Sequence, residues 1–170
     1  MKKIHKFTSD QKLAWWGYGE WVEEPDEVTF EHEGFKCRII RAAALEGLSP
    51  TQYMFGGHLC GYVQVPESHP WYNVGSIFDA QADIHGGITF ADYAFEEGEF
   101  WAGFDCGHSF DIIPSMIAMK KKIREDMLEK HSWIPERIPI FQECYKNIDY
   151  CILECKLLAE QAKVAQEVKK

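Results

Sequence analysis

The sequence contains no long apolar run. None of its segments approaches the roughly 18 consecutive apolar residues that an ordinary transmembrane helix requires. The amino terminus carries lysines, but the apolar stretch that follows them in a signal peptide is missing. We therefore expect a cytoplasmic protein that has no membrane partner.

Positive charge is also sparse. Lysine and arginine total 18 against 27 aspartate and glutamate residues, so the formal net charge is -9. The first dense basic tract is Lys120-Lys121-Lys122. A negative body repels phosphate backbones, which argues against general nucleic-acid binding. A local positive pocket could still hold one small anion.

Motif spacings that identify a class of site are absent as well. The six cysteines include no Cys-x-x-Cys pair, and three of them (Cys144, Cys151 and Cys155) fall in one helical segment. We therefore expect reduced thiols rather than a secreted disulfide scaffold. The sequence has no His-Glu-x-x-His helix, no P-loop and no dinucleotide-binding Gly-x-Gly-x-x-Gly fingerprint.

The composition that is present suits one folded domain over residues 1–170. Hydrophobic residues make up 46% of the chain, which is ordinary for a globular protein and enough for a core. We divide the domain into an aromatic-rich amino-terminal segment (1–27), a sheet that carries the candidate site (28–111) and a helical part (112–170).

The amino-terminal segment concentrates aromatic side chains. Trp15, Trp16, Tyr18 and Trp21 lie within seven positions, and the glycines among them favour an irregular segment over a helix. In one interpretation the indoles cover the sheet. In the other they form an aromatic wall for a planar ligand.

Alternating patterns predict the strands. Val28 to Ala42 reads as a hairpin with its turn near Glu33-Gly34, and residues 59 to 65 alternate before Pro66 ends the strand. Two further strands, Ile84 to Tyr93 and Glu99 to Asp105, are joined by a short turn. Arg38 and Arg41 would point to opposite faces of their strand, so at most one of them can face a given site, and a solvated strand position is the favoured interpretation.

Helical spacing dominates the remainder. Met116 to Lys130 shows a helical pattern, and Glu143 to Lys169 repeats apolar residues at the spacing of an amphipathic helix. We predict an α+β fold, in which a twisted antiparallel sheet of about five strands carries the long carboxy-terminal helix on one face.

A dense polar cluster lies on either side of the second predicted hairpin. Its halves are Asp83 to Phe90 and Trp101 to Asp111. Pairing of the two strands would bring His85 and Asp105 to the same end of the sheet, so one shared site is expected. Gly86-Gly87 would let the backbone approach a ligand or adopt positive φ angles.

Several chemistries suit this cluster. A divalent cation such as zinc could use His and Asp ligands and keep an open position for water. Cys106, two residues from His108, could act as a nucleophile or be an inert buried thiol. An acid/base pair could form without metal, or the same groups could be a buried hydrogen-bond network. The candidate ligand types are His58, Cys60, His69, His85, Asp105, Cys106, His108 and Asp111.

A non-catalytic pocket is the remaining alternative. Carboxylates accept hydrogen bonds from sugar hydroxyls, aromatic rings stack on bases, and histidines or exposed backbone N–H groups donate to phosphate. The candidate ligand-binding residues are His69, Trp71, His85, Gly86, Gly87, Thr89, Trp101, Asp105, His108 and Asp111.

Three motifs together resemble a family of small proteins encoded by bacteriophages and prophages, over roughly residues 57 to 162. The motifs are Cys60-Gly61-Tyr62-Val63-x-Val65-Pro66-x-x-His69-Pro70, His85-Gly86-Gly87-Ile88-Thr89-Phe90 and Gly103-Phe104-Asp105-Cys106-x-His108-x-x-Asp111. The helix Tyr145-x-x-x-x-Tyr150-x-x-x-Glu154-x-x-x-Leu158-Ala159-Glu160-Gln161 is similar too. The resemblance implies a phage accessory protein in the cytoplasm of a bacterial host, acting against host defence on a small nucleotide-like molecule.

Three functional hypotheses follow. In the first, the protein sequesters such a molecule at the cluster, with Trp71 or Trp101 stacking on it. In the second, the cluster (His85, Asp105, His108 and Asp111) is the catalytic centre of a hydrolase that uses a divalent metal or an acid/base pair. In the third, the segment from Trp15 to Trp21 docks on a host protein as an inhibitor. An exposed aromatic patch and a long amphipathic helix would also suit a homo-oligomer.

Overall fold

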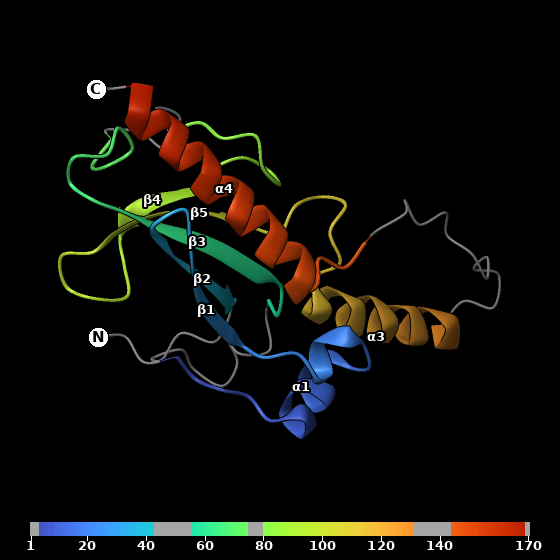
Figure 1. The fold of residues 1–170 in the computed structure, drawn as a ribbon. Coiled ribbons are helices and arrows are strands. Elements are labelled where there is room, and N and C mark those ends of the chain that lie inside the picture. Colours follow the sequence, from blue (N-terminus) through green and yellow to red (C-terminus); the bar gives the residue numbers. More distant parts are fainter. Residues whose placement is uncertain (1–3, 43–55, 75–79, 131–143, 169–170) are drawn as a thin grey trace.

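The fold is a five-stranded antiparallel sheet with one long helix across it, as predicted (Figure 1). The computed structural model describes residues 4–42, 56–74, 80–130 and 144–168. The strand order is β1-β2-β3-β5-β4. The strands are β1 Glu27–His32, β2 Phe35–Arg41, β3 Leu59–Val65, β4 Phe90–Tyr93 and β5 Phe100–Asp105. The helices are α1 Ser9–Trp16, η1 Glu20–Val22 (a 3-10 helix), α3 Pro114–Lys130 and α4 Ile148–Val168.

The first hairpin turns where the sequence predicts it. Glu33 and Gly34 connect β1 to β2 with φ angles of 50° and 83°, and His32 pairs with Phe35. Two successive positive φ angles give a turn whose twist matches that of the flanking strands. The hairpin is therefore closed by a two-residue turn.

The second hairpin is shorter than predicted. β4 begins at Phe90 rather than at Ile84, because Gly86 and Gly87 adopt φ angles of 67° and 75° that interrupt an extended strand. The preceding residues form a turn, closed by a hydrogen bond from the Gly87 N–H to the Ile84 carbonyl. This turn, and not a strand, carries His85.

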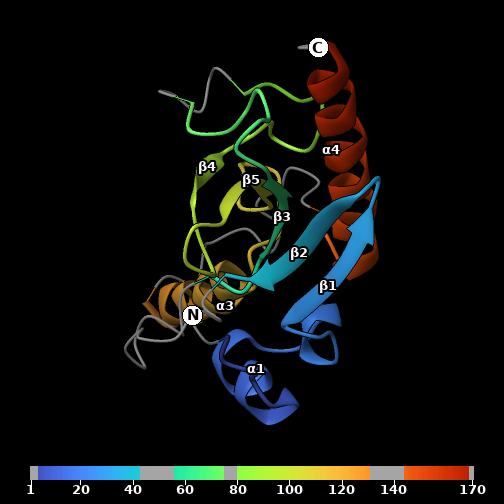
Figure 2. The ribbon, with the colours of Figure 1, turned by 60° about the vertical axis from the view of Figure 1, so that its left-hand side comes forward.

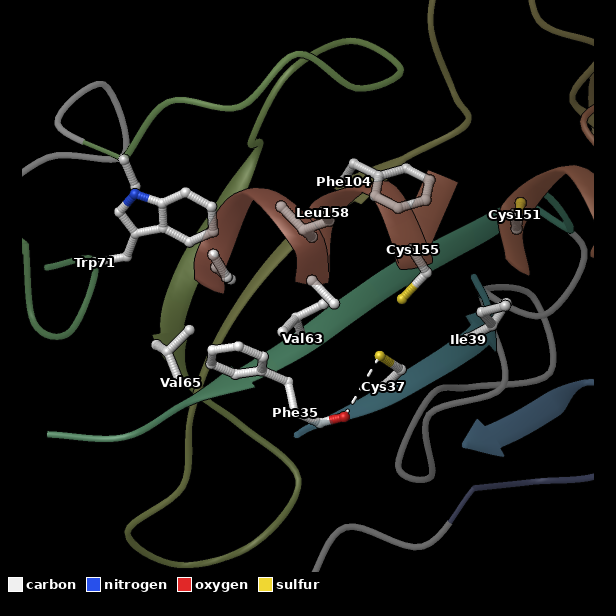
Figure 3. Packing of buried hydrophobic residues seen from close by; sticks show 14 of the residues in the cluster. Phe35, Cys37, Ile39, Val63, Val65, Trp71, Phe104, Cys151, Cys155 and Leu158 are labelled. Carbon is white, nitrogen blue, oxygen red and sulfur yellow. Dashed lines mark hydrogen bonds between the residues drawn. The ribbon is translucent and has the colours of Figure 1, made fainter. Parts of the chain in front are cut away.

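Helix α4 covers one face of the sheet (Figure 3). Its buried residues (Cys151, Cys155, Leu158, Ala159 and Ala162) pack against strand residues such as Ile39 and Val63. The helix starts later than predicted because the Asn147 side chain accepts a hydrogen bond from the Tyr150 N–H, which is an N-cap arrangement. Residues 131–143, which include the start predicted at Glu143, lie outside the described residues.

The amino-terminal segment covers the opposite face. Trp16 and Trp21 are buried with Ile40 and Trp101 in a second core, so these indoles cover the sheet. The expectation of an irregular segment is wrong for Ser9–Trp16, where Thr8 and Gln11 form a capping box that starts α1. In Figures 1 and 2, α1 and α3 lie side by side beyond one end of the sheet.

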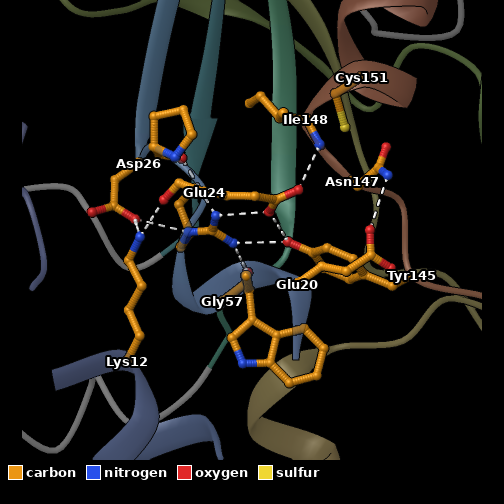
Figure 4. A network of polar contacts seen from close by, with 12 residues as sticks. Lys12, Glu20, Glu24, Asp26, Gly57, Tyr145, Asn147, Ile148 and Cys151 are labelled. Atoms are coloured by element: carbon orange, nitrogen blue, oxygen red, sulfur yellow. Dashed lines mark hydrogen bonds and ion pairs between the residues drawn. The ribbon is translucent and has the colours of Figure 1, made fainter. Parts of the chain in front are cut away.

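Arg41 was expected at the surface, but it is buried. Its side chain is fully buried, and its guanidinium donates to Asp26 (Nε to Oδ1, 2.8 Å) and to the Gly57 carbonyl (2.7 Å) (Figure 4). It also contacts the Tyr145 hydroxyl at 3.0 Å and pairs with Glu24 at 3.1 Å. The expected solvated position is therefore wrong for Arg41, which joins the amino-terminal segment to the residues before α4.

No helix in the described part of the chain combines the length and apolarity needed to cross a bilayer. All six cysteines are free thiols, as expected from their spacing.

Candidate functional site

The site is centred on one carboxylate oxygen. Asp111, in the loop after β5, is buried, and its Oδ2 atom lies 2.8 Å from His85 Nε2. The same oxygen accepts a hydrogen bond from the His108 N–H at 2.9 Å and lies 3.5 Å from His108 Nδ1. Two imidazole rings therefore converge on one oxygen atom.

His85 is held from α4. Its N–H donates to Glu154 Oε2 at 2.8 Å, and its Nδ1 lies 3.1 Å from the Tyr150 hydroxyl. Burial and the neighbouring Glu154 raise the pKa of Tyr150 to about 12, so the phenol keeps its proton at neutral pH.

The roles of the two His85 ring nitrogens in these hydrogen bonds depend on the tautomer. When Tyr150 donates its proton to Glu154, it accepts a hydrogen bond from His85 Nδ1–H. The Nε2 lone pair then faces the Asp111 carboxylate at 2.8 Å. Two lone pairs at that distance require a proton or a cation between them.

His108 is positioned by a glycine. A Cβ atom at Gly86 would overlap the His108 ring, so the ring can keep this place only while position 86 lacks a side chain. The Nδ1 atom of His108 is buried and has no hydrogen-bond partner among the described residues, although Asp111 lies nearby at 3.5 Å. A buried polar atom without a partner is uncommon in a folded protein and needs an explanation.

Asp105 lies at the edge of this cluster. Burial raises the pKa of Asp105, but hydrogen bonds from the Thr89 side chain and the Gly107 N–H outweigh it, so the pKa is lowered overall. The Asp105 Oδ1 atom lies 4.0 Å from His108 Nδ1. Thr89 is held in place by a hydrogen bond from its N–H to the Gly103 carbonyl. The carboxylate is thus a charged acceptor beside the two histidines.

His58 belongs to the same surroundings, although the sequence singled it out only as one ligand type among several. A Cβ atom at Gly107 would lie 3.0 Å from Asp105 Oδ1 and 3.2 Å from His58 Nε2. Burial lowers the pKa of His58, and its buried Nδ1 atom has no partner in the described structure. The strand register explains why His58 lies here. Cys60 pairs with Asp105, so His58, two residues before Cys60, approaches the residues that follow β5.

The donor atoms of His85, His108 and Asp111 lie within 4.8 Å of one another. Ligands bound at about 2.0–2.1 Å in tetrahedral geometry lie roughly 3.4 Å apart. The distances from Asp111 Oδ2 to His85 Nε2 (2.8 Å) and to His108 Nδ1 (3.5 Å) lie on either side of that value. Small side-chain shifts would therefore suffice to hold a cation.

Three predicted ligand-binding residues lie elsewhere. Trp101 and Asp105 are four residues apart on β5, which separates them by roughly 13 Å, and the Trp101 ring is buried against Phe95. His69 is fully buried, where its Nδ1 accepts from the Trp71 N–H and its Nε2 donates to the Ala162 carbonyl. Trp71 is buried beside His69 in the core under α4.

The remaining predicted residues meet at the cluster. His85, Gly86, Thr89, Asp105, His108 and Asp111 come together as described above. Gly87 follows in the same turn, and a Cβ atom there would meet no atom within 4 Å.

Cys106 has the features of a buried structural thiol. Its side chain is buried, and its sulfur lies 3.6 Å from that of Cys151 on α4. The hydrogen bond with Cys151 and burial raise the pKa of Cys106. A thiolate nucleophile is therefore disfavoured at this position.

Comparisons with known proteins give no match. No family model matches the chain, and no curated protein and no solved structure is significantly similar to it. The resemblance to phage-encoded proteins stays a prediction.

Proposed function

We propose that the protein is a metal-dependent hydrolase whose divalent cation is bound by His85, His108 and Asp111. The observation that carries the proposal is the convergence of both imidazole rings on Asp111 Oδ2, with the buried Nδ1 of His108 lacking a partner. A cation among the three donor atoms would satisfy all of them at once.

The surrounding residues support a metal site. Metal-binding histidines usually place their second ring nitrogen against a hydrogen-bonding partner that fixes the tautomer and the ring orientation. Tyr150 is that partner for His85, and Glu154, which raises the pKa of Tyr150, accepts from the His85 N–H. The metal-binding nitrogen would then be Nε2, which faces Asp111.

Three protein ligands suit catalysis better than a purely structural role. Structural zinc sites are usually closed by four protein ligands, whereas catalytic sites keep a position for water. A bound divalent cation lowers the pKa of that water from 15.7 to roughly 7. Asp105 and the neutral His58 lie close enough to take part in the proton transfers that follow.

The sequestration hypothesis relies on an indole that stacks on the bound base. Trp71 and Trp101, the indoles expected to stack on a base, are buried in the two cores. Trp16 and Trp21 are buried as well, which leaves Tyr18 as the exposed ring of the segment expected to dock on a host protein. In the phage context that the motifs imply, the substrate would be a small molecule of the host cell.

Metal binding tests the proposal directly. Protein stripped with a chelator is titrated with Zn²⁺ or Mn²⁺ by calorimetry, and one cation per chain is expected. His85→Ala and Asp111→Ala remove ligands, so each should weaken affinity by more than the roughly 10–100-fold typical for loss of a supporting partner. His32→Ala, which removes a histidine paired with Glu160 away from the cluster, should bind normally.

Turnover separates a hydrolase from a sequestering protein. The metal-loaded protein at catalytic concentration should cleave an activated ester, such as p-nitrophenyl acetate or p-nitrophenyl phosphate, over many turnovers. Failure of the wild-type protein to bind a divalent cation would refute the metal site. Metal binding with neither ester cleaved would refute the hydrolase and favour binding alone.

A further inference from the structure

A pocket of about 260 Å³ lies directly beside the metal-binding residues. One wall is the loop after β5, which contributes His108 and Asp111 themselves. The other wall is the start of α3. The lining residues are Gly107, His108, Ser109, Asp111, Ile113, Met116, Ile117 and Lys120. A molecule in this pocket would therefore contact two of the three metal-binding side chains.

The α3 wall has a regular chemical pattern. Ile113, Met116, Ile117 and Lys120 are spaced by three, four and seven residues, and the Ile117 N–H donates to the Ile113 carbonyl. This spacing places the four residues on one side of the helical path. The wall thus consists of apolar residues followed by one lysine, Lys120.

Charge decides which molecules suit this pocket. The chain as a whole carries a formal charge of -9 and repels anions, so an anion would be held only where positive charges are concentrated. A divalent cation at His108 and Asp111 and the ammonium of Lys120 would supply that concentration on two sides of one small space.

We propose that this pocket binds a small phosphate ester, with its phosphoryl group between the metal ion and Lys120. This inference rests on the proposed function and names the substrate class of the same site. A metal ion together with a lysine is a common way to stabilise the charge on a transferring phosphoryl group. Ile113, Met116 and Ile117 would contact the apolar part of the esterified alcohol.

The reaction would be hydrolysis of the P–O ester bond. A water molecule activated by the metal ion loses a proton and attacks phosphorus, a new P–O bond forms, and the ester P–O bond breaks. The leaving alkoxide takes up one proton, so one ester and one water give one alcohol and one inorganic phosphate. The pocket volume lies just below the usual 300–1,000 Å³ of ligand sites, which favours a small ester.

The test compares two esters on metal-loaded protein. The p-nitrophenyl phosphate should be cleaved and p-nitrophenyl acetate should be a poorer substrate, while inorganic phosphate should inhibit competitively. Lys120→Ala should reduce kcat/KM for the phosphate ester and weaken phosphate inhibition by about 10- to 100-fold, the range expected for loss of one charge-assisted hydrogen bond. Lys120→Arg should retain most activity.

Two controls make the result specific to the pocket. Lys122 is exposed two residues further along α3, which turns it about 200° around the helix, so Lys122→Ala should leave both constants unchanged. Metal affinity, measured by calorimetry with the cation alone, should be unchanged in Lys120→Ala.

The outcomes distinguish the substrate class from the reaction type. Cleavage of the acetate ester with no cleavage of the phosphate ester and no inhibition by phosphate would overturn the phosphate assignment and leave the hydrolase standing. Equal losses in Lys120→Ala and Lys122→Ala would also overturn it, because they would indicate a general charge effect. Absence of metal binding would instead defeat the proposed function.

Discussion

Two adjacent glycines provide a matched test of how the site is built. Gly86 and Gly87 have nearly equal φ angles of 67° and 75°, so an alanine at either position pays a similar backbone penalty. They differ in what a side chain would meet. A Cβ atom at Gly86 would overlap the His108 ring, whereas one at Gly87 would have no atom within 4 Å.

The magnitudes follow from these two facts. The left-handed conformation costs a non-glycine residue roughly 1–2 kcal/mol, so Gly87→Ala should lower the free energy of unfolding by that amount and leave the cluster intact. Gly86→Ala should cost at least as much and also displace His108 from Asp111. Loss of one metal-binding side chain should weaken cation affinity by more than about 10–100-fold.

The assay uses both variants side by side. Urea denaturation gives the free energy of unfolding, and calorimetric titration with Zn²⁺ gives the affinity. The expected result is a stability loss in both variants, at least as large in Gly86→Ala, with a large affinity loss in Gly86→Ala alone. Equal metal affinities in the two variants would refute the positioning of His108 by Gly86.

Three further predictions concern the rest of the molecule. Asp26→Ala leaves Arg41 buried without this counter-charge and should lower the free energy of unfolding by about 3–5 kcal/mol in urea denaturation; a loss below 1 kcal/mol would contradict this. Burial lowers the pKa of His58 below its ordinary 6.5, so the unfolded chain takes up this proton more readily and stability should fall as the pH drops below 6.5. One such group changes the free energy of unfolding by at most about 1.4 kcal/mol per pH unit. His58→Gln should reduce this pH dependence in a series of thermal denaturation measurements, and an unchanged pH dependence would mean that another group titrates. Cys144 is the exposed thiol among the six cysteines, so a thiol reagent should modify about one thiol quickly in the native protein and all six after unfolding; rapid native modification of further thiols would contradict their burial.

The sheet and α4 could be predicted because their patterns depend on local spacing. The alternation in β3 and the helical repeat through Cys155 and Leu158 follow directly from which faces are buried. The turn that carries His85 could not be separated from β4 in this way. The turn residues also alternate between apolar and polar side chains, as a strand would. The positive φ angles of Gly86 and Gly87 are what make this segment a turn.

The site could be predicted in part for a similar reason. His85, Asp105, His108 and Asp111 flank one hairpin, so local pairing brings them together. Tyr150 and Glu154 approach His85 from α4, more than 60 residues away in the sequence. Their spacing of four residues on a helix is the signal that could have indicated a shared polar face.

The position of Arg41 could not be predicted from its strand. Its burial depends on acceptors from three distant segments: residues 24–26, Gly57 and Tyr145. A sequence pattern shows an arginine on a strand, but it does not show that acceptors from other segments will surround it. Buried charges are retained where such partners exist, and only the tertiary structure reveals them.

The site is held by its backbone as well as by its rings, and this bears on what a cation would do. The His85 N–H is bound by Glu154, the His108 N–H by Asp111, and the Asp111 N–H donates to the His108 carbonyl. These bonds join protein groups only, and the core under α4 does not involve the cluster's donor atoms. A zinc finger, by contrast, is unfolded without its metal because the metal supplies the folding energy. Here protein hydrogen bonds hold the donors and the core lies apart from them, so removing a bound cation should abolish activity while the protein stays folded, as expected for a catalytic site rather than a structural one.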